Sequence, residues 1–422
     1  MAKTSEIVAG LDLGSSKVSC VIAEGGGTEA KNIIGVAIVP SSGGLRDGQV
    51  VSIDRTTEAI VAAVDEASRM AGCQITNVRL GIGGAATMGF NSEGTVAIRG
   101  GRVVAQDIER VLEGARAVAL PADRQVLHAL PQEFIIDGHD RIRTPVGMNG
   151  VRLEARVHVI TTARTALVNA IECTSKANLV VERVMFNGLA ASGSVLTAEE
   201  RELGCVLVDI GGGTTDVAVW YDHALVHSVS LEWGGDELTR QIARGLRTPI
   251  REAEQIKQRY GSALAAMVDE GETMEVPSVG GREPQTRQRH LLCEILEPGL
   301  EDLFGRIGQE IDVAGCRELL AAGVVLTGGT ANLQAIADLG EEMLVGMPVK
   351  VGSPRSASSG LVGGLIEVVD DPRYASAVGL CLDVFEGASQ GQQLASGRPL
   401  RKERPRGKGV WGGFRRLLDS WF

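Results

Sequence analysis

The sequence predicts an α/β protein made of two related halves, with an inserted α+β subdomain and an amphipathic C-terminal helix. Two segments carry the prediction of related halves. IVAGLDLGSSKVSCVIAE and CVLVDIGGGTTDVAVW each run as a β-rich stretch, an Asp, a glycine turn and a second alternating stretch. Aligning Asp12 with Asp209 superimposes the two patterns at a separation of 197 residues. We therefore expect both halves to open with a glycine-turn hairpin.

Length and residue usage narrow the class of protein. A chain of 422 residues is long enough for two to four domains. The seven cysteines form no C-x-x-C pair and the six histidines no metal-binding spacing, so a reducing cytoplasm fits best. The start MAKTSEIVAGLDLG has neither the basic stretch nor the long apolar run of a signal peptide, and no segment reaches the roughly 20 apolar residues of a spanning helix.

Charge is distributed unevenly along the chain. The net charge is −11, but residues 398–422 carry eight Lys or Arg and two Asp or Glu, a local balance of +6 that leaves −17 on residues 1–397. A basic tail on an acidic body predicts a negatively charged partner, membrane or nucleic acid, for the tail alone. The body should repel nucleic acid.

The first half is interrupted by a segment with a different pattern of helix and strand residues. VRLGIGGAATMG reads as the end of a strand, and we interpret its glycines as a strand-end turn. QDIERVLEGARAVAL has helical spacing, whereas VLHALPQEFIIDG and RLEARVHVIT read as strands. These patterns predict an inserted subdomain over residues 84–161. The first half then comprises residues 1–83, 162–203 and 355–385.

The second half is expected over residues 204–354, with a smaller lobe at about 236–312. After its hairpin, GGDELTRQIARGLRTPIREAEQIKQRYG has helical spacing, PSVGGREPQTRQR reads as a loop, and HLLCEILEPGLEDLFGRIGQEI reads as a further helix. AAGVVLTGGTANLQAIADL then supplies another strand and a third glycine turn.

The tail combines a polar linker with an amphipathic segment. Residues 386–407 have almost no apolar content and predict a flexible linker, and residues 408–422 predict a helix. On a helical wheel the apolar side chains share one face, Arg415 and Arg416 lie outside it, and the aromatic rings suit a lipid headgroup boundary. The apolar face consists of Val410, Trp411, Phe414, Leu417, Leu418, Trp421 and Phe422. Docking on the protein's own core is the alternative, against which the linker argues.

The glycine turns have the composition of a phosphate clamp. Backbone N–H groups at tight turns of small residues bind anions, and a phosphate-bound Mg²⁺ prefers carboxylates and water. The first turn offers Asp12, Gly14, Ser15, Ser16 and Lys17, and the second offers Asp209, Gly211, Gly212, Gly213, Thr214, Thr215 and Asp216. Glycines that only form hairpin turns, with Asp residues that cap those turns, are the alternative interpretation. Two copies of the turn at matching positions, with a third turn in TGGTAN, favour nucleotide binding instead. No G-x-x-x-x-G-K-[ST] sequence is present, so the chain is not a P-loop enzyme.

These turns resemble the phosphate 1, phosphate 2 and adenosine motifs of the actin and Hsp70 ATPase superfamily. Within it the chain is most similar to the FtsA family of bacterial cell-division proteins, through VLHALPQEFIIDG, PVGMNGVRLEARVHVIT, FNGLAASGSVLT, EVPSVGGREP and DPRYASAVGL. The resemblance spans nearly the whole chain. It implies a two-lobed actin-like (ribonuclease H-like) ATPase fold that binds ATP and Mg²⁺.

The resemblance also implies roles for single residues. The residues of the two turns would hold the phosphates, and Asp12 and Asp209 would hold Mg²⁺. Contacts to ribose and adenine would come from Gly235, Glu254, Lys257, Gly328, Gly329 and Thr330. Without the resemblance, Glu254 and Lys257 would read as a solvated ion pair on one helix face.

One position departs from the superfamily pattern. Asn187 stands where many members carry a Glu that positions the attacking water, and an amide can orient water but cannot act as a base. We therefore expect ATP binding with at most weak hydrolysis, and Asp209 or Asp216 as the only general bases.

The implied partners are FtsZ, other copies of the chain in a filament, anionic lipids and later division proteins, with no nucleic acid. The chain would lie on the cytoplasmic face of the cell membrane at the division site, and Arg282, Arg287 and Arg289 would meet the acidic C-terminal peptide of FtsZ. A phosphotransferase such as a sugar kinase, a chaperone-like ATPase and a pilus assembly protein are the competing hypotheses.

Overall fold

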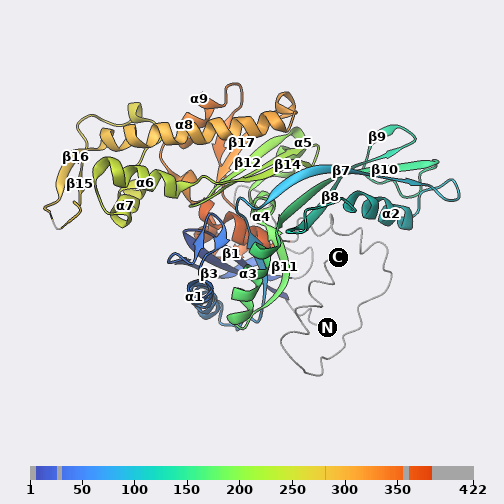
Figure 1. Cartoon of the computed structure of the whole chain (residues 1–422), viewed down its shortest axis with the longest axis horizontal. Helices are drawn as coiled ribbons and strands as arrows, with labels where there is room; N and C mark the ends of the chain where they lie inside the picture. Colours follow the sequence, from blue (N-terminus) through green and yellow to red (C-terminus); the bar gives the residue numbers. More distant parts are fainter. Residues whose placement is uncertain (1–5, 26–30, 281, 355–360, 383–422) are drawn as a thin grey trace.

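Two β-sheets with helices packed on them carry the fold (Figure 1). The computed structural model describes residues 6–25, 31–280, 282–354 and 361–382. The predicted linker 386–407 and the predicted helix 408–422 lie outside the described residues. Within the described part, no helix combines the length and hydropathy required to cross a bilayer.

The first sheet has six strands in the order β11-β6-β1-β2-β3-β19. Its strands are β1 (Glu6–Leu13), β2 (Lys17–Gly25), β3 (Lys31–Pro40), β6 (Asn77–Ile82), β11 (Val180–Phe186) and β19 (Leu361–Gly364). A short hairpin, β4 (Leu45–Arg46) and β5 (Gln49–Val50), follows β3. We call this sheet and its helices the first half.

The second sheet has nine strands in the order β18-β17-β12-β13-β14-β7-β10-β8-β9. The strands of the second half are β12 (Cys205–Ile210), β13 (Thr215–Tyr221), β14 (Ala224–Leu231), β17 (Gly323–Thr327) and β18 (Val349–Val351). The inserted subdomain extends the same sheet with β7 (Met88–Ala97), β8 (Arg124–Ile136), β9 (His139–Ile142) and β10 (Arg152–Ala163). It therefore shares a sheet with the half to which it is not directly joined in sequence.

The predicted internal repeat is present as a repeated strand register. In the β1–β2 hairpin Asp12 pairs with Ser19, and in the β12–β13 hairpin Asp209 pairs with Asp216, so both pairs keep the offset of 197 residues. Each first strand also has a parallel neighbour, β6 in one sheet and β17 in the other. Because the turns close at the same point of both sheets, they are equivalent structural positions.

The helices follow the apolar periodicity of the sequence. The first half contains α1 (Ile53–Ala71), α3 (Arg164–Lys176), α4 (Asn187–Val195), α5 (Ala198–Leu203), α10 (Ile366–Val369) and α11 (Ala375–Cys381). The inserted subdomain contains α2 (Ala105–Arg116), and the second half contains α6 (Gly235–Leu246), α7 (Ile250–Tyr260), α8 (Arg289–Val313) and α9 (Ile336–Met343). Ser52 caps α1 by accepting from the amide of Arg55, and Gly72 ends the helix with φ +67°.

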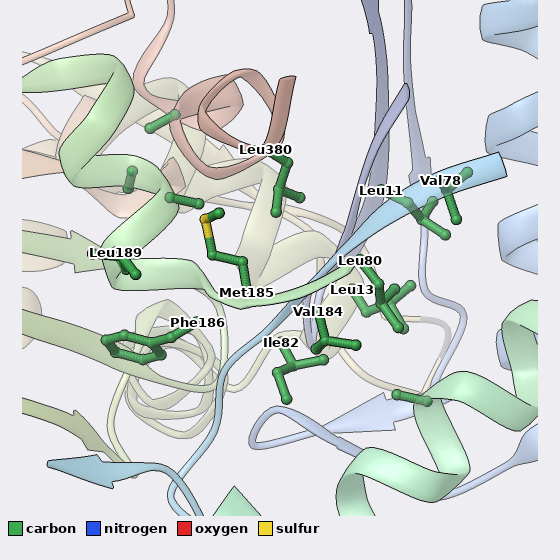
Figure 2. Packing of buried hydrophobic residues seen from close by; sticks show 14 of the residues in the cluster. Leu11, Leu13, Val78, Leu80, Ile82, Val184, Met185, Phe186, Leu189 and Leu380 are labelled. Carbon is green, nitrogen blue, oxygen red and sulfur yellow. The ribbon is translucent and has the colours of Figure 1, made fainter. Parts of the chain in front are cut away.

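The core of the first half forms where its central strands meet α4 and α11 (Figure 2). Leu11 on β1 and Leu80 on β6 are fully buried, and Leu189 on α4 lies in the same cluster. Burying each such side chain contributes about 1.5–3 kcal/mol. This packing holds the carboxyl ends of β1 and β6 in place, and both strands end at the cleft described below.

One predicted loop is wrong in part. The segment PSVGGREPQTRQR contains β16 (Gln285–Gln288), which pairs antiparallel with β15 (Thr273–Val276). All four side chains of β16 are exposed, so the strand carries no apolar alternation from which a sequence pattern could detect it. The predicted helix over HLLCEILEPGLEDLFGRIGQEI is confirmed as α8, which continues through Pro298.

Candidate functional site

The two predicted glycine turns lie against each other. Gly14 donates its amide to Lys17 O at 2.9 Å, and Gly211 donates its amide to Thr214 O at 2.9 Å. A Cβ at Gly212 would lie 2.8 Å from the Cβ of Ser16, and one at Gly213 would lie 2.6 Å from Ser15 Oγ. Only glycine therefore allows the second turn to approach the first this closely.

A cavity opens between the turns and collects most of the predicted phosphate-binding residues. Asp12, Gly14, Ser15, Ser16, Lys17, Asp209, Gly211, Gly212, Thr214, Asp216, Gly328 and Gly329 all line it. Gly213 and Thr215 lie behind it, because Gly213 faces Ser15 and the Thr215 hydroxyl donates to Trp233 O at 2.8 Å. Backbone amides, hydroxyls and one ammonium group thus surround a single opening, as an anion site requires.

Three carboxyl groups line this cavity, and those of Asp12 and Asp216 are buried while that of Asp209 is partly buried. Burial raises the pKa of Asp12, although Lys17 and hydrogen bonds from Ser19 and Asn187 oppose the shift. Burial likewise raises the pKa of Asp209 to about 6, and Ser376 Oγ donates to its Oδ2 at 2.8 Å. Burial therefore disfavours the ionised form of these carboxyl groups, and a bound cation would favour it.

Asp216 has the most perturbed environment of the three. Burial and the neighbouring Asp209 raise the pKa of Asp216 well above its ordinary value. Its Oδ1 atom is buried and has no hydrogen-bond partner among the described residues. Leaving a buried carboxylate oxygen unpaired costs roughly 1–3 kcal/mol or more, so this atom is placed to accept a bond from something in the cavity.

Lys17 supplies the positive charge of the first turn. Its Nζ donates to Arg373 O, and burial lowers its pKa while Asp12 and Asp209 oppose that shift. Arg373 also lines the cavity, and its guanidinium is paired with Asp371 at 2.8 Å. Lys17 is the positive charge that acts on the carboxyl groups of Asp12 and Asp209.

The acidic residues fit a magnesium ion shared with phosphate. Among the described residues, no three His, Cys, Asp or Glu side chains are arranged to hold a metal ion on their own. Mg²⁺ is commonly bound by one or two carboxylates and completed by phosphate oxygens and water. The unpaired Oδ1 of Asp216, the buried carboxyl group of Asp12 and the partly buried carboxyl group of Asp209 suit that mode.

The residues predicted to contact the nucleoside lie together on one side of the second turn. Lys257 Nζ donates to Gly235 O at 2.8 Å and pairs with Glu254 at 2.7 Å, and the Thr330 hydroxyl donates to Gly211 O at 3.1 Å. A Cβ on Gly235 would lie 2.5 Å from Thr330 Oγ1. Glu254 is partly exposed and Lys257 is buried, so the pair is not the solvated ion pair that its spacing alone would suggest.

Asn187, the residue at the departure from the superfamily pattern, begins α4 at the cavity wall. Its Nδ2 donates to Asp12 Oδ1 at 2.9 Å, and its Oδ1 is buried with no partner in the described part of the chain. The carboxyl group of Asp12 thus fixes the side-chain amide of Asn187, and the Oδ1 atom of Asn187 can still accept a hydrogen bond.

Several cavity residues were not predicted from the sequence. Gly48 comes from the loop after β4, where its amide donates to Ser15 Oγ at 2.9 Å. Gly83 follows β6, and Pro372, Arg373 and Ser376 come from the segment around the start of α11. Gly83 had a usable signal, because the turn after β6 is the counterpart of the TGGTAN turn after β17.

The three predicted FtsZ-binding arginines differ in availability. Arg282 and Arg287 are exposed. Arg289 instead donates to Tyr260 O at 2.7 Å, pairs with Glu272 at 2.7 Å and donates to Gln334 Oε1 at 2.6 Å. Its guanidinium holds the start of α8 against neighbouring segments of the second half.

Two repeated sheets that meet at facing glycine turns define an actin-like ATPase fold. Solved structures with this fold include a PilM–PilN type IV pilus biogenesis complex, with 18% identity, coverage of 91% of this chain and 98% of that chain, and a TM-score of 0.64. MreB5 of Spiroplasma citri bound to ADP shares 14% identity, with coverage of 93% and 99% and a TM-score of 0.52.

Sequence relatives specify the family. The model of the cell division protein FtsA matches residues 206–379, and that of the SHS2 domain inserted in FtsA matches residues 84–161. FtsA of Pseudomonas aeruginosa is 42% identical over 405 residues (96% of this chain, 95% of the relative), and FtsA of Escherichia coli K12 is 38% identical over 386 residues (90% of each). The chain belongs to the FtsA family and is an actin-like cell division protein. Membership of this family implies that the cleft binds a nucleotide.

Proposed function

We propose that the cleft binds ATP together with Mg²⁺, and that ATP favours assembly of the chain into filaments on the cytoplasmic face of the cell membrane. These filaments anchor the FtsZ ring at the division site and recruit later division proteins. The observation that carries the proposal is the contact of two glycine turns beside three carboxyl groups that line one cavity. ATP binding at this point would join the two halves.

Different residues of the cleft would hold the phosphates, the Mg²⁺ ion and the nucleoside. Residues 14–17 of the first turn and Gly211, Gly212 and Thr214 of the second line the cavity from opposite halves, and Lys17 adds a positive charge. Asp12, Asp209 and Asp216 would hold Mg²⁺ directly or through water, and the ion would neutralise phosphate charge. Gly235, Glu254 and Lys257 would take the ribose and adenine, with Gly328, Gly329 and Thr330 beneath the base.

Hydrolysis is expected to be weak. With a pKa of about 6, Asp209 is ionised at neutral pH and can accept a proton, but its Oδ2 is already bonded to Ser376. Asn187 can orient a water molecule and cannot remove its proton. We expect phosphate release well below the roughly 1–10³ s⁻¹ of ordinary enzymes, and turnover within that range would contradict this assignment.

Membrane attachment is assigned to residues 408–422. One short amphipathic helix binds lipid weakly and reversibly, whereas many helices on one filament bind together at high effective concentration. Co-sedimentation with anionic liposomes, with and without ATP, tests this part of the proposal. Deleting Val410–Phe422 should abolish sedimentation with liposomes, and retained sedimentation of the truncated chain would overturn the anchor.

The FtsZ contact is assigned to the smaller lobe. Arg282 and Arg287 are exposed and could pair with acidic residues of a peptide, whereas the bonds made by Arg289 argue for a structural role. The double substitution Arg282→Ala, Arg287→Ala should weaken binding of the FtsZ C-terminal peptide. Unchanged peptide affinity would remove both residues from the contact.

A further inference from the structure

The inserted subdomain is bonded to the first half and also closes its own two connections. The amide of Arg164 at the start of α3 donates to Asp123 O at 2.8 Å, and the amide of Phe186 on β11 donates to His128 Nε2 at 3.0 Å. Arg124, at the start of β8, donates from Nη2 to Ala86 O at 2.9 Å on the entering segment. The same nitrogen donates to Thr161 Oγ1 at 2.8 Å, on the strand that leads out. The Thr87 hydroxyl bonds that of Thr162 at 3.2 Å, and all three threonines are buried. These bonds join both connections into one unit.

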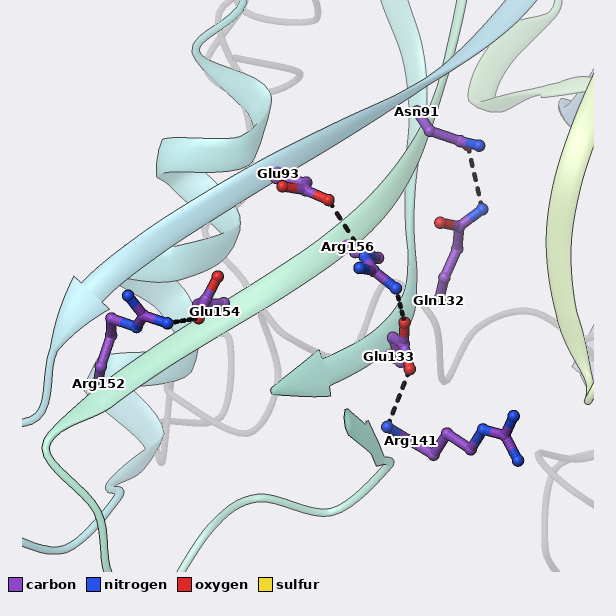
Figure 3. A network of polar contacts seen from close by, with 8 residues as sticks. All are labelled: Asn91, Glu93, Gln132, Glu133, Arg141, Arg152, Glu154 and Arg156. Atoms are coloured by element: carbon purple, nitrogen blue, oxygen red, sulfur yellow. Dashed lines mark hydrogen bonds and ion pairs between the residues drawn. The ribbon is translucent and has the colours of Figure 1, made fainter. Parts of the chain in front are cut away.

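The same subdomain is also bonded to the second half along the length of β14. We call this set of contacts the seam. At its outer end Arg143 pairs with Asp222 at 2.6 Å. Further in, Gln132 Nε2 donates to Leu225 O at 2.9 Å and Asn91 Nδ2 donates to Val226 O at 3.1 Å. Figure 3 shows Asn91 and Gln132 side by side, and Gln132 also donates to Asn91 Oδ1 at 3.1 Å.

The inner end of the seam reaches the nucleotide cleft. His158 on β10 is buried between Asn91 Oδ1 at 2.7 Å and Ser228 Oγ at 2.8 Å. Two residues further along β14, Ser230 Oγ accepts from the amide of Gly84 at 3.1 Å and hydrogen-bonds the carboxyl group of Asp216. The seam contacts therefore extend from Asp216, which lines the cavity, to Asp222, which lies just before β14.

The seam is the weaker of the two attachments of β7. Within the described residues, the strand register joins β14 to β7 at one pair, Val229 with Met88, whereas β7 and β10 share ten registered pairs. The remaining seam contacts are made by side chains. Relative movement of the two halves would therefore open the seam before it opened the sheet of the inserted subdomain.

We propose that the inserted subdomain is a strap across the nucleotide cleft, bonded to the first half through Asp123 and His128 and holding the second half through the seam along β14. When the seam opens, the two glycine turns lose a restraint on their separation. The strap thereby links the spacing of the cleft to the position of the subdomain that extends to one end of the molecule (Figure 1).

Hydrogen exchange of the full-length chain without nucleotide tests this proposal. The variant Asn91→Ala, Gln132→Ala removes the two central seam bonds to β14. The matched control is Arg156→Gln, since Arg156 pairs with Glu93 and Glu133 inside the subdomain on the same sheet (Figure 3). The variant should exchange at least about fivefold faster than the native chain over residues 222–231. A smaller increase of about twofold is expected over residues 14–17 and 211–216.

The control should match the native chain in all these segments, and protection over residues 153–157 in the double variant shows that the subdomain stays folded. Unchanged exchange over residues 222–231 would contradict the claim that the seam holds β14 in place. Faster exchange there with unchanged exchange at both turns would overturn the restraint on the cleft. Because no nucleotide is added, a failure of ATP binding would count against the proposed function and would be separate from this result.

Discussion

Single hydrogen bonds at the cleft decide which of its carboxyl groups are available to a ligand. Asp12 is bonded by Ser19 and Asn187, and Asp209 is bonded by Ser376, whereas Asp216 keeps one buried oxygen unpaired. The residue types in the two turns predicted a phosphate clamp, and the turns do face one cavity. Sequence reasoning could not predict Ser376, because its role depends on α11 reaching the end of β12 from 167 residues away.

Burial makes His158 sensitive to pH. Desolvation lowers its pKa to about 3, against about 6.5 in an unfolded chain, so between these values the unfolded state binds more protons and stability falls as pH falls. At pH 5 the loss is about 2 kcal/mol relative to pH 7. His158→Gln lacks the titrating group, and its free energy of unfolding should therefore decrease less between pH 7 and pH 5. Urea unfolding of both proteins at the two pH values measures this difference, and parallel changes would contradict it.

At the scale of elements, apolar periodicity and turn residues predicted α2, the α6–α7 region and α8, together with the strands of the two glycine-turn hairpins. They could not reveal the exposed strand β16, nor the joining of β7 to β14, because pairing between distant strands leaves no local pattern. The internal repeat was predictable because its signal is a repeated sequence of residue types, and the strand register keeps the same offset.

Helix α8 offers a matched pair of glycines. A Cβ added at Gly305 meets no described atom within 4 Å, whereas one at Gly299 would lie 2.9 Å from Leu238 Cδ2 and 2.4 Å from Gln241 Oε1 on α6. We expect Gly305→Ala to stabilise the protein by about 0.5–1 kcal/mol, through helix propensity and a less flexible unfolded chain. Gly299→Ala should destabilise it, because the fully buried side chain of Leu238 must shift to make room. Thermal unfolding tests both changes, and equal effects would contradict this view of the packing.

At the scale of the whole molecule, two equivalent hairpins from different halves create one site. Neither half has the complete set of groups, since Lys17 comes from the first turn and Asp209 and Asp216 belong to the second hairpin. The charge of the chain is also divided between two parts. The acidic body carries the cleft, and the basic tail carries the predicted membrane contact.

Equilibrium binding of ATP with Mg²⁺ to the purified full-length chain tests the central claim most directly. Gly212→Val places a side chain between the turns, where even an added Cβ would lie 2.8 Å from the Cβ of Ser16. Gly305→Ala serves as the control, because a Cβ added there meets no described atom within 4 Å. The native chain and the control should bind ATP with equal affinity, and Gly212→Val should lose at least about tenfold. Absence of binding to the native chain, or equal binding by Gly212→Val, would contradict a phosphate site between the two turns.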